Sequence, residues 1–178
     1  FMLVAAMNPC PCGHYGENNP AHPCTCTPAQ IHRYMSRISG PLLDRIDIQC
    51  DIQPVPYSLL KEEQPSESSA AIRERVLRAR AIQHNRFAEY NKTAKNPIHC
   101  NAQMTPKLVR EYCLIDAQGD KLLAYSMEKL GLSARAYDRI LKVARTIADI
   151  AGSAHIEAPH LQEAIDFHKL CANMVPEL

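Results

Sequence analysis

The stretch FMLVAAMNPCPCG at residues 1–13, followed after a loop by ISGPLLDRIDI at residues 38–48, decides the fold of this chain. The short apolar run before Asn8 is typical of a strand buried on both faces of a sheet. Apolar and polar residues alternate across residues 46–52, which predicts a half-buried strand entered through Arg45. Because ligands of α/β sheets bind outside the strand ends, we expect these two strands to form a nucleotide-sensing edge.

The composition and the first residue of the chain indicate what kind of protein it is. The sequence has 178 residues, a net charge of +1 and a pI near 7.7, so overall charge argues neither for nor against nucleic acid. It contains no apolar run of about eighteen residues and no signal sequence, so we expect a soluble, cytoplasmic protein with no membrane partner. Phe1 lies directly in an apolar run. Because a domain rarely begins inside a strand, we expect a fragment of a longer protein.

Signals for helices follow the first strand. Thr27-Pro28 predicts the start of a helix with apolar residues on one face, and Gly40-Pro41 predicts its end. Residues 55–68 are rich in Pro, Ser and Glu, which indicates a linker. Beyond it every segment is helical in pattern, with helices predicted from Ser68 or Ser69 to about Phe87, from Thr105-Pro106 to Tyr112, from Asp116 to Gly131, from Ala134 to Ala151 behind Ser133, and from Ala158-Pro159 onward.

The predicted fold is therefore mainly α. Residues 1–54 are expected to hold two strands, one helix and a Cys-rich loop at 9–27, as a small α/β remnant. Residues 55–68 form the predicted linker, and residues 69–178 form a predicted bundle of four or five short helices.

Four of the eight cysteines lie in two tight pairs, Cys10-x-Cys12 and Cys24-x-Cys26. Four thiolates are the ligand set of a closed, structural Zn²⁺ site, and a metal would give this proline-rich loop a core that burial alone cannot provide. An ordinary reduced loop is the alternative, and His14 or His22 could replace a missing cysteine. The scattered cysteines at positions 50, 100, 113 and 171 are expected to be reduced core residues.

Three single residues are candidates for nucleotide chemistry. Asn8 could orient a water through its amide, or it could be a turn residue before proline. Arg45 could reach a ligand, or it could form a surface ion pair with Asp44 or Asp47. Arg135 lies in the first turn of a capped helix, where a cation opposes the helix dipole unless an anion such as phosphate binds there.

Five arginines lie on the helix that begins near Ser69, against the single acidic residue Glu74. Such a stripe could follow a nucleic-acid backbone, but we favour a solvated helix face. The arginines are Arg73, Arg75, Arg78, Arg80 and Arg86.

Both opening motifs, together with LSARAYDRILKVARTIADIAG at residues 132–152 and HLQEAI at residues 160–165, closely resemble the Mg-chelatase-like AAA+ ATPases of the ComM/YifB type. The resemblance implies that residues 1–54 are the end of the ATPase core and that the helical domain is its lid. It places Asn8 at the sensor-1 position, Arg45 at the arginine-finger position and Arg135 at the sensor-2 position. All three are then expected to be catalytic and to bind ATP with Mg²⁺ in a hexameric ring.

The resemblance also limits what this chain can do. The family's Walker A and Walker B elements belong before residue 1, and the sequence contains no G-x-x-x-x-G-K-[ST] motif. We therefore expect ATP and Mg²⁺ binding and hydrolysis only in the full-length protein. The ComM type implies a DNA branch-migration helicase, which the Cys-rich loop fits. The alternatives are a magnesium-chelatase-type motor acting on a protein partner and a zinc-stabilised protein-interaction module.

Overall fold

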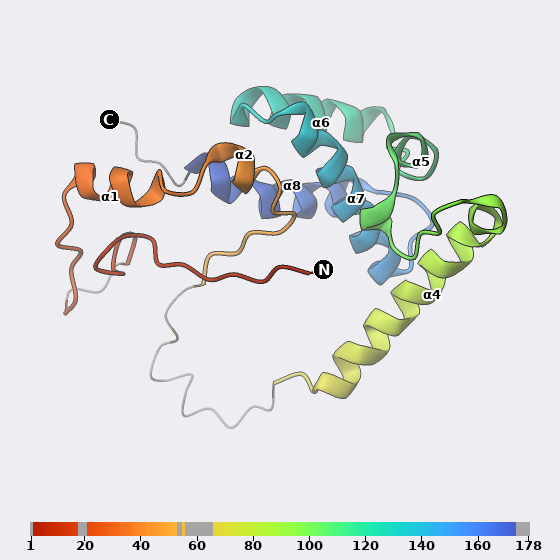
Figure 1. The fold of residues 1–178 in the computed structure, drawn as a ribbon, viewed down its shortest axis with the longest axis horizontal. Helices are drawn as coiled ribbons and strands as arrows, with labels where there is room; N and C mark the ends of the chain where they lie inside the picture. The colour runs from red at the N-terminus through yellow and green to blue at the C-terminus, as the bar shows by residue number, and fades with distance from the viewer. Residues whose placement is uncertain (1, 18–20, 53–54, 56–65, 174–178) are drawn as a thin grey trace.

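The structure is a computed structural model that describes residues 2–17, 21–52, 55 and 66–173, with side chains up to residue 168. Across these residues the chain forms helices and no strand, which confirms the predicted mainly α fold (Figure 1). No helix in the described part is long and apolar enough to cross a membrane.

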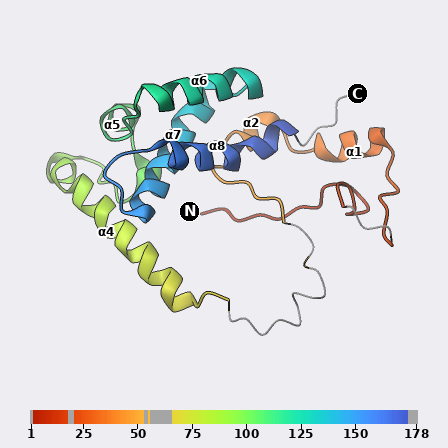
Figure 2. The same ribbon diagram turned by 180° about the vertical axis from the view of Figure 1, so that it is seen from behind.

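A helical bundle makes up the second part of the chain, and one helix lies at its centre. Helix α7 (Ala134–Ala151) contacts α4 (Ser69–Thr93), α5 (Pro106–Tyr112) and α8 (Ala158–Asn173), as well as the short 3-10 helix η1 (Asn101–Gln103). Helix α6 (Ala117–Leu130) packs on α8, as Figure 2 shows from behind. The side chains at the centre of the bundle are apolar, and Phe87, Leu123, Ile140, Leu161 and Ile165 are the largest that are fully buried.

The helix boundaries follow the capping signals in the sequence. Ser68, Asp116 and Ser133 each accept a hydrogen bond from a backbone N–H of the first turn, as expected of N-caps. Gly131 and Gly152 end α6 and α7 with φ of 60° and 73°, a conformation that favours glycine. Helix α4 continues six residues past its predicted end at Phe87 because its next turn still packs on the core through Tyr90.

A polar cluster lies inside the bundle, beside its apolar core. Asp149 has a side chain with 0% exposure, and it accepts hydrogen bonds from Arg86, Arg145 and Asn101. Gln83 accepts a hydrogen bond from the backbone N–H of Asn101. The cluster joins α4, η1 and α7, and each buried charge in it has a partner of opposite sign.

The first part of the chain carries two short helices. Helix α1 (Pro28–Met35) begins at a capping box between Thr27 and Gln30, as Thr27-Pro28 predicted. Its end was predicted too late: α1 stops at Met35, and Gly40-Pro41 begins helix α2 (Gly40–Leu43) instead of ending α1. Proline fits the first turn of a helix because that turn needs no N–H bond, which explains the second helix. Along the long axis of the molecule, α1 and α4 lie at opposite ends (Figure 1).

Both predicted strands are absent from the described residues. Residues 2–7 and 46–52 are neither helix nor strand, and Met2, Val4 and Ile52 are more than four-fifths exposed. A strand needs a neighbour to pair its N–H and C=O groups, and the described part of the chain offers none to either segment. Cys50, predicted to be a core residue, is consequently exposed, whereas Cys113 is buried as predicted.

The predicted linker at 55–68 falls mostly outside the described residues, which omit 56–65. The domain boundary therefore stays a prediction. So does the reduced state of Cys171, because its side chain is also outside the described part.

Candidate functional site

The four clustered cysteines lie together in the fold. Their sulfur atoms are all within 4.8 Å of one another, and three of the separations are 3.3 Å for Cys10–Cys12, 3.6 Å for Cys12–Cys24 and 3.8 Å for Cys10–Cys24. A Zn–S bond of about 2.3 Å in tetrahedral geometry puts sulfur atoms about 3.8 Å apart. The donor set and its spacing therefore fit zinc.

A turn and a helix place these sulfur atoms. The N–H of Gly13 donates to the C=O of Cys10 at 3.1 Å, and Gly13 closes the turn with a φ of 89°. Cys10 is completely buried and packs with Ile31 and Met35 of α1. The Cys-rich loop and α1 thus share one small core, which is distinct from the core of the bundle.

Hydrogen bonds and burial give the thiols of the loop very different pKa values. Backbone N–H groups of His14 and Thr25 lower the pKa of Cys12 to about 5, so this sulfur is a thiolate at neutral pH. Burial, together with the neighbouring thiols, raises the pKa of Cys26 to about 12. A divalent cation at the centre would favour the thiolate form of all four, as metal binding to cysteine requires.

The two histidines proposed as substitute ligands lie outside the sulfur group. Nδ1 of His14 lies 2.8 Å from a carboxylate oxygen of Glu17, and its ring stacks on His22 with centroids 5.7 Å apart. The hydrogen bond to Glu17 raises the pKa of His14. Four cysteine ligands leave no open position for a substrate, so the arrangement suits a structural site and no hydrolytic chemistry.

Asn8 lies beside the turn of the Cys-rich loop. Its side chain is exposed, and a methyl group on Gly13 would come 3.8 Å from its Nδ2. In the described part of the chain Asn8 therefore neighbours the sulfur cluster, and its predicted role toward a nucleotide stays a prediction.

Arg45 follows helix α2 and is exposed. Its Nη1 donates to the C=O of Pro41 at 2.6 Å, so it caps the end of the helix. The predicted alternative was an ion pair with Asp44 or Asp47, but Asp47 pairs instead with Arg139 on α7.

Arg135 lies in the first turn of α7 with an exposed side chain, as the sequence predicted. That turn contains no acidic residue, and Ser133 caps it through a hydrogen bond to the N–H of Ala136. The remaining N–H groups and the guanidinium group make this end of α7 positive, which is the arrangement that an anion favours.

An ion pair joins the segment after Arg45 to the helix that carries Arg135. Asp47, two residues after Arg45, pairs with Arg139, one helical turn after Arg135. Within the described residues, Asn8 forms no ion pair or hydrogen bond to α7. The ion pair thus connects sequence neighbours of Arg45 and Arg135, and the sequence did not reveal it.

The predicted arginine stripe on α4 is interrupted. Arg86 turns into the bundle, where its side chain is 12% exposed and pairs with Asp149. Arg75 pairs with Glu67 at 2.7 Å and Arg78 with Glu74 at 2.8 Å, both at the surface. The favoured interpretation of a solvated helix face therefore fits the other four arginines, which are exposed, but not Arg86.

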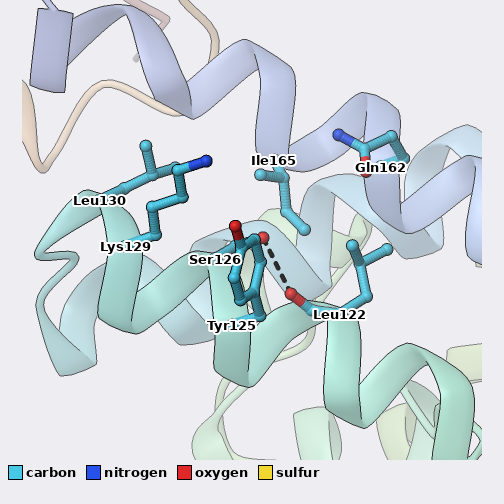
Figure 3. Close-up of a pocket in the computed structure, with 7 residues that line it drawn as sticks. All are labelled: Leu122, Tyr125, Ser126, Lys129, Leu130, Gln162 and Ile165. Carbon is cyan, nitrogen blue, oxygen red and sulfur yellow. Dashed lines mark hydrogen bonds between the residues drawn. The ribbon is translucent and has the colours of Figure 1, made fainter.

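The hollows of the bundle lie away from these candidates. One of about 140 Å³ opens between α6 and α8, and Figure 3 shows the hydroxyl of Ser126 donating to the C=O of Leu122 inside it. Neither Asn8, Arg45 nor Arg135 lines this hollow. Its lining residues are Leu122, Tyr125, Ser126, Lys129, Leu130, Gln162 and Ile165.

Sequence reasoning missed Asp47, Arg139 and the Arg145–Asp149 pair. The Arg145–Asp149 pair could have been predicted, because the two residues are four apart on the apolar face of one helix, where they are buried together. Nothing in the sequence indicated the ion pair between Asp47 and Arg139, because the two residues are far apart along the chain.

Comparisons with known proteins agree over most of the chain. A family model described as magnesium chelatase, subunit ChlI C-terminal, matches residues 66–168, and one described as magnesium chelatase, subunit ChlI, matches residues 1–60. Protein YifB of Escherichia coli is 43% identical over 171 residues, which cover 96% of this chain and 31% of YifB. Competence protein ComM of Haemophilus influenzae is 41% identical over 172 residues, with the same coverage. The chain spans about a third of the length of these curated relatives.

Proposed function

Since the chain belongs to the magnesium chelatase subunit ChlI family, in its ComM/YifB type, we propose that it is the C-terminal part of an ATP-driven ring motor that acts on DNA. The family is one of Mg-chelatase-related ATPases. The longer relatives, of which this chain covers about a third, support its place as one part of a larger protein.

One observation carries the nucleotide part of the proposal. Arg135 is an exposed cation in the positive first turn of α7, where no acidic residue compensates it. A bound ATP would supply phosphate oxygens that turn this unfavourable placement into a favourable one. Arg135 would hold the phosphates, and Arg45 would stabilise negative charge on the nucleotide of the neighbouring subunit. Asn8 would orient the attacking water.

Mixed rings of the full-length protein test this division of roles. Arg45→Ala and Asn8→Ala should each abolish ATP hydrolysis and leave nucleotide binding largely intact. If Asn8 serves its own subunit and Arg45 the next, an equal mixture of the two variants should regain about a quarter of wild-type turnover, because one junction in four combines both intact residues. Arg33→Ala, at an exposed position of α1, is the matched control and should turn over normally. A mixture as inactive as its components would contradict the assignment.

The DNA part is supported by the resemblance to the ComM type. It predicts that full-length protein binds single-stranded or forked DNA with an affinity that falls steeply as salt rises. Absence of binding at low salt would exclude a motor on DNA, and would favour the chelatase-type motor that acts on a protein partner.

We propose further that the four-cysteine cluster holds one Zn²⁺, with Cys10, Cys12, Cys24 and Cys26 as its ligands. Bound zinc would supply a cross-link among four points of a loop that has little apolar core. The shared core of the loop and α1 favours a second candidate function, a zinc-stabilised module for protein interaction. If that module is the whole function, Cys10→Ser should abolish partner binding while the Arg45→Ala variant of the full-length protein keeps it.

A further inference from the structure

The segment that follows Arg45 is fastened to two helices of the bundle. The carboxylate of Asp47 accepts a hydrogen bond from Arg139 on α7. The backbone N–H of Gln49 donates to the C=O of Phe167 on α8 at 3.1 Å. Two bonds of different kinds therefore hold residues 47–49 against the junction of α7 and α8.

A buried histidine lies behind this segment. His168 of α8 is 1% exposed, and the charged groups that act on it are Asp44 at the end of α2, Asp47 from the segment and Arg139 from α7. Burial lowers its pKa, so the ring is neutral at neutral pH. A neutral ring can be covered by the segment without the cost of burying a charge.

These contacts connect the two predicted nucleotide arginines. Arg139 lies one turn after Arg135 on the same rigid helix, and Asp47 lies two residues after Arg45. Movement of α7 is therefore passed to the segment that begins two residues after Arg45, as long as the ion pair and the Gln49–Phe167 hydrogen bond remain formed.

We propose that Asp47 and Arg139 are positioning residues that fasten the segment after Arg45 to the helix carrying Arg135, so that nucleotide held at Arg135 helps to position Arg45 toward the nucleotide of the neighbouring subunit. This inference rests on the function proposed above. The ion pair is partly exposed, with side-chain exposures of 31% for Arg139 and 52% for Asp47, so it is a reversible fastening and not part of the core.

Charge reversal in the full-length protein tests the fastening. Arg139→Asp places two negative charges together, and it should speed exchange of the Gln49 amide hydrogen by about three- to tenfold. The same variant should lower kcat for ATP hydrolysis about threefold or more and change the KM for ATP less than twofold, because Arg45 acts on the transition state. The exchanged pair Asp47→Arg with Arg139→Asp should restore both quantities to within about twofold of wild type.

The control is a charge reversal at another exposed ion pair of the chain. Arg78→Asp breaks the exposed Arg78–Glu74 pair within α4, and it should leave both the Gln49 exchange rate and kcat unchanged. Two results would overturn the fastening: Gln49 exchange that does not respond to Arg139→Asp, or an exchanged pair that restores neither quantity. If full-length protein hydrolyses no ATP, the proposed function fails, whereas the exchange measurements still decide whether the fastening exists.

Discussion

Arg86 on α4 and Asp149 on α7 form a bidentate ion pair inside the bundle, although they lie 63 residues apart in the sequence. Arg145 shares the same carboxylate through its Nε at 3.1 Å. Burial alone would raise the pKa of Asp149, but the hydrogen bonds from Arg86 and Asn101 outweigh it and lower the pKa below its usual value. The carboxylate is therefore ionised, and it holds two arginines in the core.

Replacement of Asp149 by Ala should strongly lower the free energy of unfolding of the bundle. The change leaves Arg86 and Arg145 buried without their counter-charge, which typically costs about 3–5 kcal/mol of unfolding free energy. Urea denaturation followed by circular dichroism measures this loss. Arg78→Ala, which removes an exposed pair, should cost about 0.5 kcal/mol or less. Equal losses of unfolding free energy in the two variants would show that the buried ion pair contributes no more to stability than an exposed one.

Zinc should be present in the Cys-rich loop at about one ion per chain in protein purified without chelator. Cys10→Ser should remove most of the metal, because Cys10 is the fully buried member of the cluster. Treatment with a chelator should make the four loop thiols newly reactive toward a thiol reagent. Cys50→Ser, at an exposed cysteine outside the cluster, should keep the full metal content. Wild-type protein that was purified without chelator, contains no zinc and already has four reactive loop thiols would refute the site.

Gly13→Ala should weaken the loop because Gly13 has a φ of 89°, which an alanine adopts only with strain of about 1–2 kcal/mol. We expect zinc affinity, measured by competition with a coloured chelator, to fall about tenfold. Gly40→Ala is the matched control: Gly40 lies at the start of α2 with open space around it, so its affinity should match wild type. An unchanged affinity in Gly13→Ala would mean that the Cys10–Gly13 turn does not shape the site.

Acid should destabilise the junction at His168. The folded-state pKa of His168 is lowered from an ordinary value of 6.5, so the unfolded chain binds the extra proton more readily. Its contribution to stability is therefore fully present above about pH 6.5 and is lost as pH falls below it. His168→Gln should flatten the pH dependence of the unfolding free energy between about pH 6.5 and 5, measured by urea titrations at each pH. Parallel curves for variant and wild type would contradict this.

Much of the bundle could be predicted because its signals are local. Asp116, Gly131 and Ser133 determine helix ends through hydrogen bonds within one turn, and Pro106 does so through its fixed φ at the first helical position. The structure confirms each of these boundaries. The cysteine cluster was predictable for the same reason, since its ligands lie in two pairs in one loop.

The strands could not be predicted correctly from their own residues. An apolar run such as 2–7 shows that a segment favours burial, but a strand also needs a neighbour, and the described residues supply none. Arg86 was misplaced for a related reason: its partner Asp149 lies on a distant helix, so the local pattern suggested a solvated face. The residue pattern of a single helix cannot show which distant residue one of its side chains will pair with.

Helix α7 joins a buried ion-pair cluster near its C-terminal end to an exposed arginine at its N-terminal end. Its C-terminal half is locked by Asp149 and Arg145, whereas Arg135, about 21 Å away along the axis at roughly 1.5 Å per residue, stands at the surface. Between these two ends of the helix, Ala136 and Ile140 are completely buried. A force on Arg135 is therefore carried along a helix that packs on the core over most of its length, and it reaches α4 and η1 through the carboxylate of Asp149.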